Sequence, residues 1–240
     1  MNEYELKVYD VVSDWQRKIS RRSGMISRLS KKAQGKMNGL IPERVHEVMT
    51  ESIKAMVKAT LFGSKITTNK NKARGFTLQE RDELARKKII TYQKTAIVEG
   101  AGTGAGGILL GLADFPLLLT IKMKFLFEVA SIYGFDTSEY EERLFILHVF
   151  QLAFSSDEVR KDTLGEIENW EERKQRLAEL DWRQFQQEYR DYIDLAKMLQ
   201  LVPGIGAFVG AYANNNLLKH LGETAMNSYR LRILKKAPEL

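Results

Sequence analysis

Apolar residues recur at helical spacing along most of the chain, and this pattern predicts an all-α fold. One apolar face runs from residue 3 to residue 20, and its members are Tyr4, Val8, Val11, Val12, Trp15 and Ile19. A second face covers residues 45–61 and follows Pro42, which suits the first turn of a helix. Alternating apolar and polar runs bounded by hairpin turns are missing from the sequence. We therefore predict a multi-helix bundle without a sheet.

Capping and turn residues predict several helix boundaries. Thr77 is followed three positions later by Glu80, a capping box that opens a helix. A helix over residues 122–133 should end at Gly134, and Thr137 or Ser138 should cap the next one.

Further along the chain, residues 157–194 predict an acidic amphipathic helix and residues 205–235 a final helix. The basic residues at the end of that final helix, Arg230, Arg232, Lys235 and Lys236, have the favourable sign for a helix C-terminus.

Two glycine-rich apolar segments, residues 100–121 and 201–215, are expected to meet at the centre of the bundle. Six glycines fall within the first twelve positions of the longer segment. Small residues four positions apart let helix backbones approach closely. The residues we assign to packing or membrane insertion are Gly100, Gly104, Gly107, Gly111, Asp114, Pro116, Pro203, Gly206 and Gly210.

The longer segment is compatible with burial in the core, with shallow insertion into one leaflet, or with a full span. As a straight helix, 22 residues would cover about 33 Å, but a central Asp114 would cost at least ~2.5 kcal/mol in a bilayer. Asp114 precedes Phe115 and Pro116, so we favour a helix N-cap over an ionisable ligand site. The shorter segment is too short to cross.

The charge of the chain is concentrated near its start. Residues 1–100 contain 21 Lys and Arg against 11 Asp and Glu, a net charge of +10, whereas the whole chain carries +6. Eight cations and no acid lie among residues 15–42. We assign lipid contact to Arg17, Lys18, Arg21, Arg22, Arg28, Lys31 and Lys32, because such clusters attract anionic membranes. Nucleic acid or plain solvation are the competing interpretations.

Composition favours one helical domain over residues 1–240, with a basic helical region at 1–40 and a connector at 65–75. There is no cysteine, as in proteins of reducing compartments. The first residues are too charged for the apolar core of a secretory signal, so we expect a cytoplasmic protein at the inner face of the membrane.

Catalytic and cofactor motifs are weak. Gly102, Gly104 and Gly107 fit GxGxxG, but they lie between helical patterns, and the strand and acid of a dinucleotide site do not follow. Glu43 and His46 form a single Glu-x-x-His, whereas a dimetal bundle needs two. We therefore expect that the protein is not an enzyme and that it binds no metal, no cofactor and no nucleic acid. We expect His148 to be a hydrogen-bonded residue of the core.

The two glycine-rich segments, GAGTGAGGILLGLADFPLLLTIKMKFLFEVASIYGFD and VPGIGAFVGAYANNNLLKHLGETAMNSYR, resemble the EcsC protein family. The opening WQRKISRRSGMISRLSKKAQGKMNGLIPERV is similar to that of its bacillus-type members. The resemblance covers nearly the whole chain. The resemblance implies that the protein is encoded beside the ABC transporter formed by EcsA and EcsB, and that the subunits of this transporter are its partners. It implies no known activity and no catalytic residue.

The sequence thus predicts a membrane-associated helical accessory protein. The alternative is a soluble helical protein with a glycine-lined pocket for an apolar, lipid-like ligand.

Overall fold

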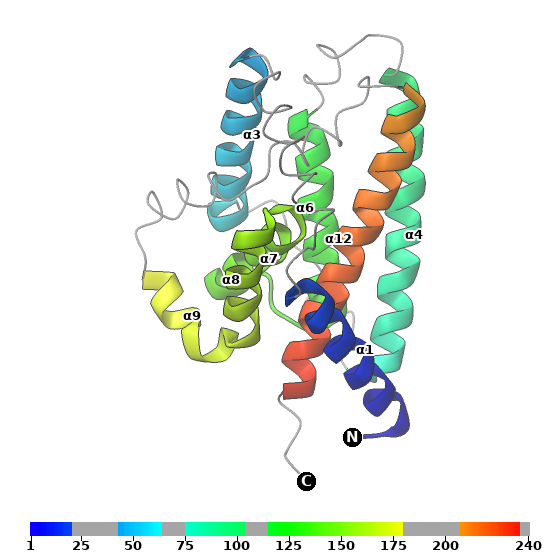
Figure 1. The fold of residues 1–240 in the computed structure, drawn as a ribbon, viewed down its shortest axis with the longest axis vertical. Helices are drawn as coiled ribbons and strands as arrows, with labels where there is room; N and C mark the ends of the chain where they lie inside the picture. Colours follow the sequence, from blue (N-terminus) through cyan, green and yellow to red (C-terminus); the bar gives the residue numbers. More distant parts are fainter. Residues whose placement is uncertain (21–42, 64–74, 104–114, 180–206, 236–240) are drawn as a thin grey trace.

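The computed structural model describes residues 1–20, 43–63, 75–103, 115–179 and 207–235, which form eight α-helices and no strand (Figure 1). The helices are α1 (Glu3–Ser20), α3 (Glu43–Phe62), α4 (Leu78–Thr103), α6 (Phe115–Ile132), α7 (Tyr140–Phe154), α8 (Asp157–Glu168), α9 (Trp170–Glu179) and α12 (Ala207–Lys235). The fold is all-α, as predicted.

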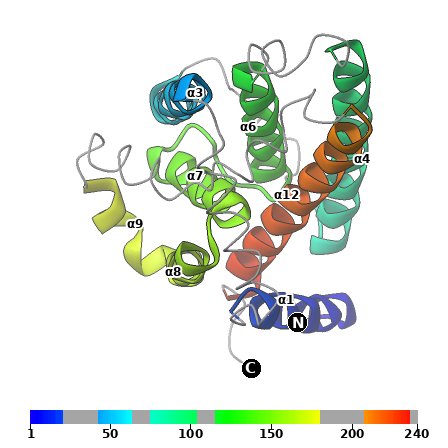
Figure 2. The ribbon, with the colours of Figure 1, turned by 45° about the horizontal axis from the view of Figure 1, so that its top comes forward.

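Helices α6 and α7 form the centre of the molecule. Every side chain of α7 from Leu144 to Phe154 is buried, and most of α6 from Leu118 onward is buried as well. Helix α3 contacts both through an apolar stripe that includes Met49, Ile53 and Val57. Helix α12 contacts α6 and α7 from another side (Figure 2). Met49, Ile53 and Val57 belong to the apolar face predicted over residues 45–61, and that face is buried in the core.

The two longest helices, α4 and α12, lie side by side and run in opposite directions (Figures 1 and 2). A side chain at Gly222 of α12 would meet Ile89 of α4, because a Cβ atom there would lie 2.6 Å from its Cδ1 atom. Glycine at this position thus permits the close approach of the two helices. The predicted capping box opens α4, with the Thr77 amide donating to Glu80 Oε2 at 2.7 Å and the Glu80 amide to Thr77 Oγ1 at 3.3 Å.

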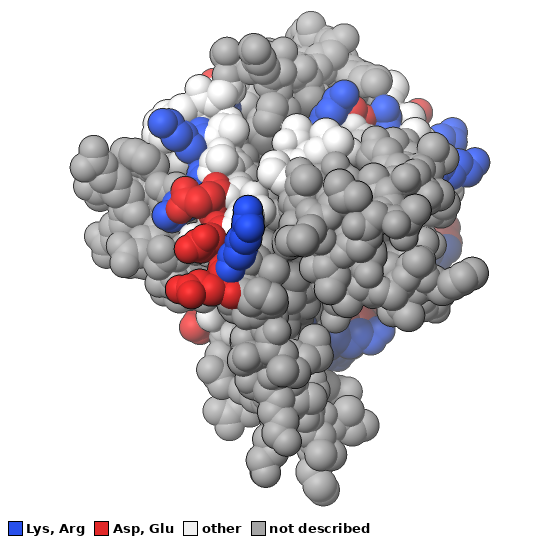
Figure 3. Space-filling view, turned by 90° about the horizontal axis from the view of Figure 1, so that it is seen from above, with Lys and Arg blue, Asp and Glu red and all other residues white. Residues whose placement is uncertain are grey.

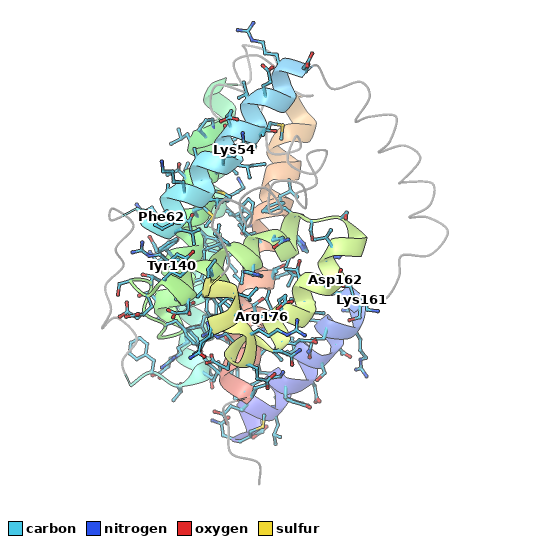
Figure 4. The ribbon with its side chains drawn as sticks, turned by 90° about the vertical axis from the view of Figure 1, so that its left-hand side faces the viewer. Lys54, Phe62, Tyr140, Lys161, Asp162 and Arg176 are labelled. Atoms are coloured by element: carbon cyan, nitrogen blue, oxygen red, sulfur yellow. The ribbon has the colours of Figure 1, made fainter. Side chains whose placement is uncertain are left out.

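The turn after α6 also follows the prediction. Gly134 has a φ of +89°, which favours glycine, and its amide donates to the Ser131 carbonyl at 3.0 Å. The Phe135 amide donates to the Ala130 carbonyl at 3.1 Å, which completes a Schellman motif. The turn brings α7 back against α6 and α3, where Phe62 and Tyr140 place their ring centroids 6.2 Å apart (Figure 4).

Two boundary predictions are wrong, and one predicted helix is too short. Helix α6 begins at Phe115, the start that an N-cap at position 114 implies, so it extends the predicted stretch 122–133 toward the N-terminus. Helix α7 is preceded by Glu139, not Thr137 or Ser138, and no side chain caps it; the Ser138 amide and hydroxyl instead donate to Asp136.

The predicted acidic helix over 157–194 is interrupted at Asn169, which has a φ of −108° and separates α8 from α9. Its backbone amide and its side-chain amide both donate to the Gly165 carbonyl, at 3.2 Å and 3.0 Å. Residues 180–194 of the predicted helix lie outside the described part of the chain.

Candidate functional site

The predicted lipid-contact cations begin in the last turn of α1. Arg17 and Lys18 are both exposed there, at the C-terminal end of a helix where cations are favourable. Arg17 forms an ion pair with Asp14, and this contact lowers the pKa of the Asp14 carboxyl. The other predicted lipid-contact residues, Arg21, Arg22, Arg28, Lys31 and Lys32, lie outside the described residues.

An open groove of about 670 Å³ lies between α1, α4 and α12. Its apolar lining comes from Val11, Trp15, Ile89, Ile90 and Met226. Its charged and polar lining comes from Asp14, Lys18, Arg86, Gln93, Lys219, Glu223, Asn227 and Arg230. The groove therefore joins an apolar strip to a group of charges in which cations outnumber acids.

A buried ion pair holds the helices that border this groove. Asp82 of α4 is fully buried, and Arg230 of α12 donates to it through Nε at 3.0 Å and Nη2 at 2.8 Å. Tyr4 of α1 donates its hydroxyl to Asp82 at 2.6 Å, and the hydroxyl of Tyr133, the residue directly after α6, also donates to it. One carboxylate thus links α4 to α1, to α12 and to the end of α6.

These contacts perturb the two phenols. Burial and the neighbouring Asp82 charge raise the pKa of Tyr133 well above its ordinary value. Burial and the hydrogen bond to Asp82 also raise the pKa of Tyr4, although Arg86 opposes the shift. Both phenols therefore stay protonated at neutral pH and act as donors.

A second buried ion pair lies two residues further along α12. Arg232 donates to Glu142 of α7 at 2.7 Å and to Glu171 of α9 at 3.1 Å. Its guanidinium carbon lies 4.0 Å from the ring centroid of Phe135. Burial raises the pKa of Glu142, while Arg232 and the Tyr229 hydroxyl oppose that shift.

Sequence reasoning missed both ion pairs. Arg230 and Arg232 were predicted to be favourable cations at a helix end, but both are buried and pair with acids from other helices. No local signal marks these pairs, since Asp82 and Arg230 are 148 residues apart.

The glycine-rich segments are only partly described. Gly100 and Gly210 belong to α4 and α12, and Pro116 stands in the first turn of α6. The remaining predicted packing residues, Gly104, Gly107, Gly111, Asp114, Pro203 and Gly206, lie outside the described residues. The packing glycine that the structure shows between α4 and α12 is Gly222, which sequence reasoning did not select.

His148 lies in the core, as predicted. Its Nδ1 atom is 2.8 Å from the Leu144 carbonyl oxygen, which can only accept, so Nδ1 carries the hydrogen. Burial lowers the pKa of His148, and its ring meets Trp170 edge-on at 5.3 Å between centroids. Within the described ranges, no group of three metal-ligating side chains comes together.

The described surface is uneven in charge. Viewed from above, acidic side chains gather on one side, and Lys and Arg side chains lie along the opposite edge, where Figure 1 places α4 (Figure 3). Among the helices described, none combines the length and the apolar character needed to cross a bilayer.

These features define an all-helical protein in which buried ion pairs join the described helices and an open amphipathic groove lies between α1, α4 and α12. The chain belongs to the EcsC protein family, whose profile matches residues 7–234. It is similar to Protein EcsC of Bacillus subtilis (strain 168), with 56% identity over 93% of both chains. It is also 33% identical to the uncharacterized protein YdbA of the same strain, over 66% of this chain and 60% of that protein. No solved structure matches it.

Proposed function

We propose that this protein is a non-enzymatic, peripheral membrane protein that binds anionic lipid surfaces through the end of α1 and the basic sequence after it. The observation that carries the proposal is the exposure of Arg17 and Lys18 at the end of α1, directly before the basic run. That run adds Arg21, Arg22, Arg28, Lys31, Lys32 and Lys36, with no acid before Glu43. Each basic residue near an anionic membrane contributes about 1 kcal/mol.

The distribution of charge favours a membrane over a nucleic acid as the partner. Residues 101–240 carry 16 Lys and Arg against 20 Asp and Glu, so the positive charge is confined to one part of the chain. The basic run also lacks the interleaved aromatic side chains on which single-stranded bases stack. A localised basic segment orients a protein on a flat anionic surface, which supports the peripheral location at the inner face of the cell membrane.

Charge reversal tests this proposal. The full-length variant with Arg17→Glu, Arg21→Glu and Arg22→Glu should bind vesicles of phosphatidylglycerol and phosphatidylcholine at least ~100-fold more weakly than the parent, because it loses about 3 kcal/mol of attraction. Co-sedimentation at roughly 0.1 M salt provides the measurement.

The matched control reverses the same number of charges elsewhere. Lys54 and Lys58 lie on α3 and Arg176 lies on α9, and Figure 4 shows Lys54 and Arg176 on these helices, away from the end of α1. Their triple change to Glu should bind vesicles much more tightly than the first variant. Equal weakening in both variants would show that net charge alone matters, and unchanged binding in the first would contradict the proposal.

We further propose that the protein is an accessory to an ABC transporter. This part is supported by the family resemblance alone: the chain belongs to the EcsC protein family, and the resemblance of its sequence implies a place beside the transporter EcsA and EcsB. Co-expression of the tagged full chain with the two transporter subunits, followed by affinity purification in mild detergent, should recover all three. Recovery of the tagged chain without either subunit would contradict the accessory role.

A further inference from the structure

The groove between α1, α4 and α12 exposes apolar side chains on two facing helices. Val11 of α1 is 51% exposed and Ile90 of α4 is 52% exposed, and both line the groove. Covering a side chain of this size stabilises a complex by roughly 1.5–3 kcal/mol relative to full exposure. A bound molecule with an apolar part would cover Val11 and Ile90, and each contact would contribute part of that free energy to binding.

The charges at the groove favour an anion. Arg230 is neutralised by Asp82, Asp14 is engaged by Arg17, and Lys219 lies 3.9 Å from Glu223. Lys18 of α1 and Arg86 of α4 are both exposed, and no salt bridge to an acid is formed by either among the described residues. Arg86 hydrogen-bonds the Tyr4 hydroxyl, and the charge of Lys18 helps Arg17 to lower the pKa of the Asp14 carboxyl. Two cations from different helices therefore line the groove together with the exposed apolar strip.

We infer that the groove binds one molecule of anionic phospholipid, with its phosphate at Lys18 and Arg86 and one acyl chain along Val11 and Ile90. A phospholipid joins a negative headgroup to an apolar chain, which is the combination that the lining presents. The volume of about 670 Å³ is in the ordinary range for small-molecule sites.

A partner helix fits the same groove less well. Among the described residues that line it, Val11 and Ile90 are the exposed large apolar side chains, so it offers a helix few anchors. Groove recognition of helices relies on anchors spread over at least two turns. An extended acyl chain has no such minimum length.

This inference deepens the proposed membrane attachment and rests on it for the source of the lipid. The two sites are nevertheless separable, because Arg86 and Ile90 line the groove and do not belong to the basic run. Substitutions can therefore distinguish attraction to a surface from occupation of the groove.

The test uses the full-length protein and isothermal titration calorimetry with a short-chain phosphatidylglycerol kept below its micelle concentration. We expect one lipid per protein molecule, and at least tenfold weaker binding of phosphatidylcholine with the same chains and of glycerol phosphate, which has no chain. Equal affinity for glycerol phosphate would mean that the groove binds a free phosphate and would overturn the lipid assignment.

Two variants in the groove and two control variants at nearby positions locate the site. Arg86→Ala and Ile90→Asp should each weaken binding of the short-chain lipid at least tenfold. Lys87→Ala and Leu6→Asp change exposed residues of the same helices that do not line the groove, and they should bind as the parent does. All four changes are at exposed positions, and circular dichroism melts confirm that each variant is folded.

The outcomes separate the two proposals. Arg86→Ala and Ile90→Asp should lose the short-chain lipid but still bind vesicles, because the basic run is unchanged in both. If the parent binds vesicles but no short-chain lipid, or if Arg86→Ala and Ile90→Asp bind it like the parent, the groove assignment is wrong and surface attachment stands. If the groove variants lose the short-chain lipid as expected, but the variant with Arg17→Glu, Arg21→Glu and Arg22→Glu still binds vesicles, surface attachment is wrong.

Discussion

Removing the charge of Asp82 should be among the most destabilising single changes in this protein. Its side chain is 0% exposed and that of Arg230 is 7% exposed, so Asp82→Asn leaves a buried guanidinium without its counter-ion. The same change places an amide before the hydroxyls of Tyr4 and Tyr133, which now both donate to the carboxylate. Breaking a buried ion pair from one side costs about 3–5 kcal/mol.

That cost is a large part of the total, because domains are stable by only about 5–15 kcal/mol. Urea unfolding followed by far-UV circular dichroism gives the free energy of unfolding for each variant, provided that the denaturant slope stays unchanged. We expect Asp82→Asn to lower this free energy by at least ~3 kcal/mol.

A double-mutant cycle separates the ion pair from local damage. Arg230→Met alone leaves the Asp82 carboxylate buried, while Asp82→Leu with Arg230→Met removes both charges. We expect the double variant to be at least ~2 kcal/mol more stable than the sum of Asp82→Leu and Arg230→Met implies. A cost below ~1 kcal/mol for Asp82→Asn, or additive effects in the cycle, would refute the reasoning.

Two further predictions concern stability. Gly165→Ala should raise the free energy of unfolding by about 0.5–1 kcal/mol, because Gly165 is inside α8 and no atom lies within 4 Å of the added methyl group; unchanged or lower urea stability would contradict this. His148→Phe should reduce acid sensitivity. Burial holds the pKa of His148 in the folded protein below its ordinary value of 6.5. As the pH falls through 6.5, the unfolded chain therefore binds a proton before the folded protein does, and the folded protein loses stability below that pH. Between pH 7.5 and 5.5 the variant should lose up to about 1.4 kcal/mol less than the parent, and an identical pH profile in both would argue against a neutral buried imidazole.

Local chemistry explains which parts of the fold the sequence predicts. The bounds of α1, the capping box at Thr77 and the turn at Gly134 all depend on residues within one or two helical turns. The interruption at Asn169 was missed because the amphipathic pattern continues through it, whereas the backbone of Asn169 leaves the helical conformation, with a φ of −108°.

The candidate site depends on contacts between distant parts of the chain. The sequence places Arg17 and Lys18 at the end of a helix, but it does not show that Lys18 shares a groove with Arg86 and Lys219. Similarly, the apolar pattern places Val11 and Trp15 on one face of α1. In the structure, however, Val11 stays half exposed, because it lies at the groove where α1 crosses α4 and α12. Helix crossings are tertiary information that no local pattern contains.

Fractionation of cells that express the full chain tests the central claim most directly. The account predicts that the protein sediments with membranes at low salt and is released by an alkaline carbonate wash, because charge and shallow contact hold it there. Recovery in the supernatant at low salt would contradict membrane attachment, and retention in the pellet after carbonate would contradict a peripheral mode of binding.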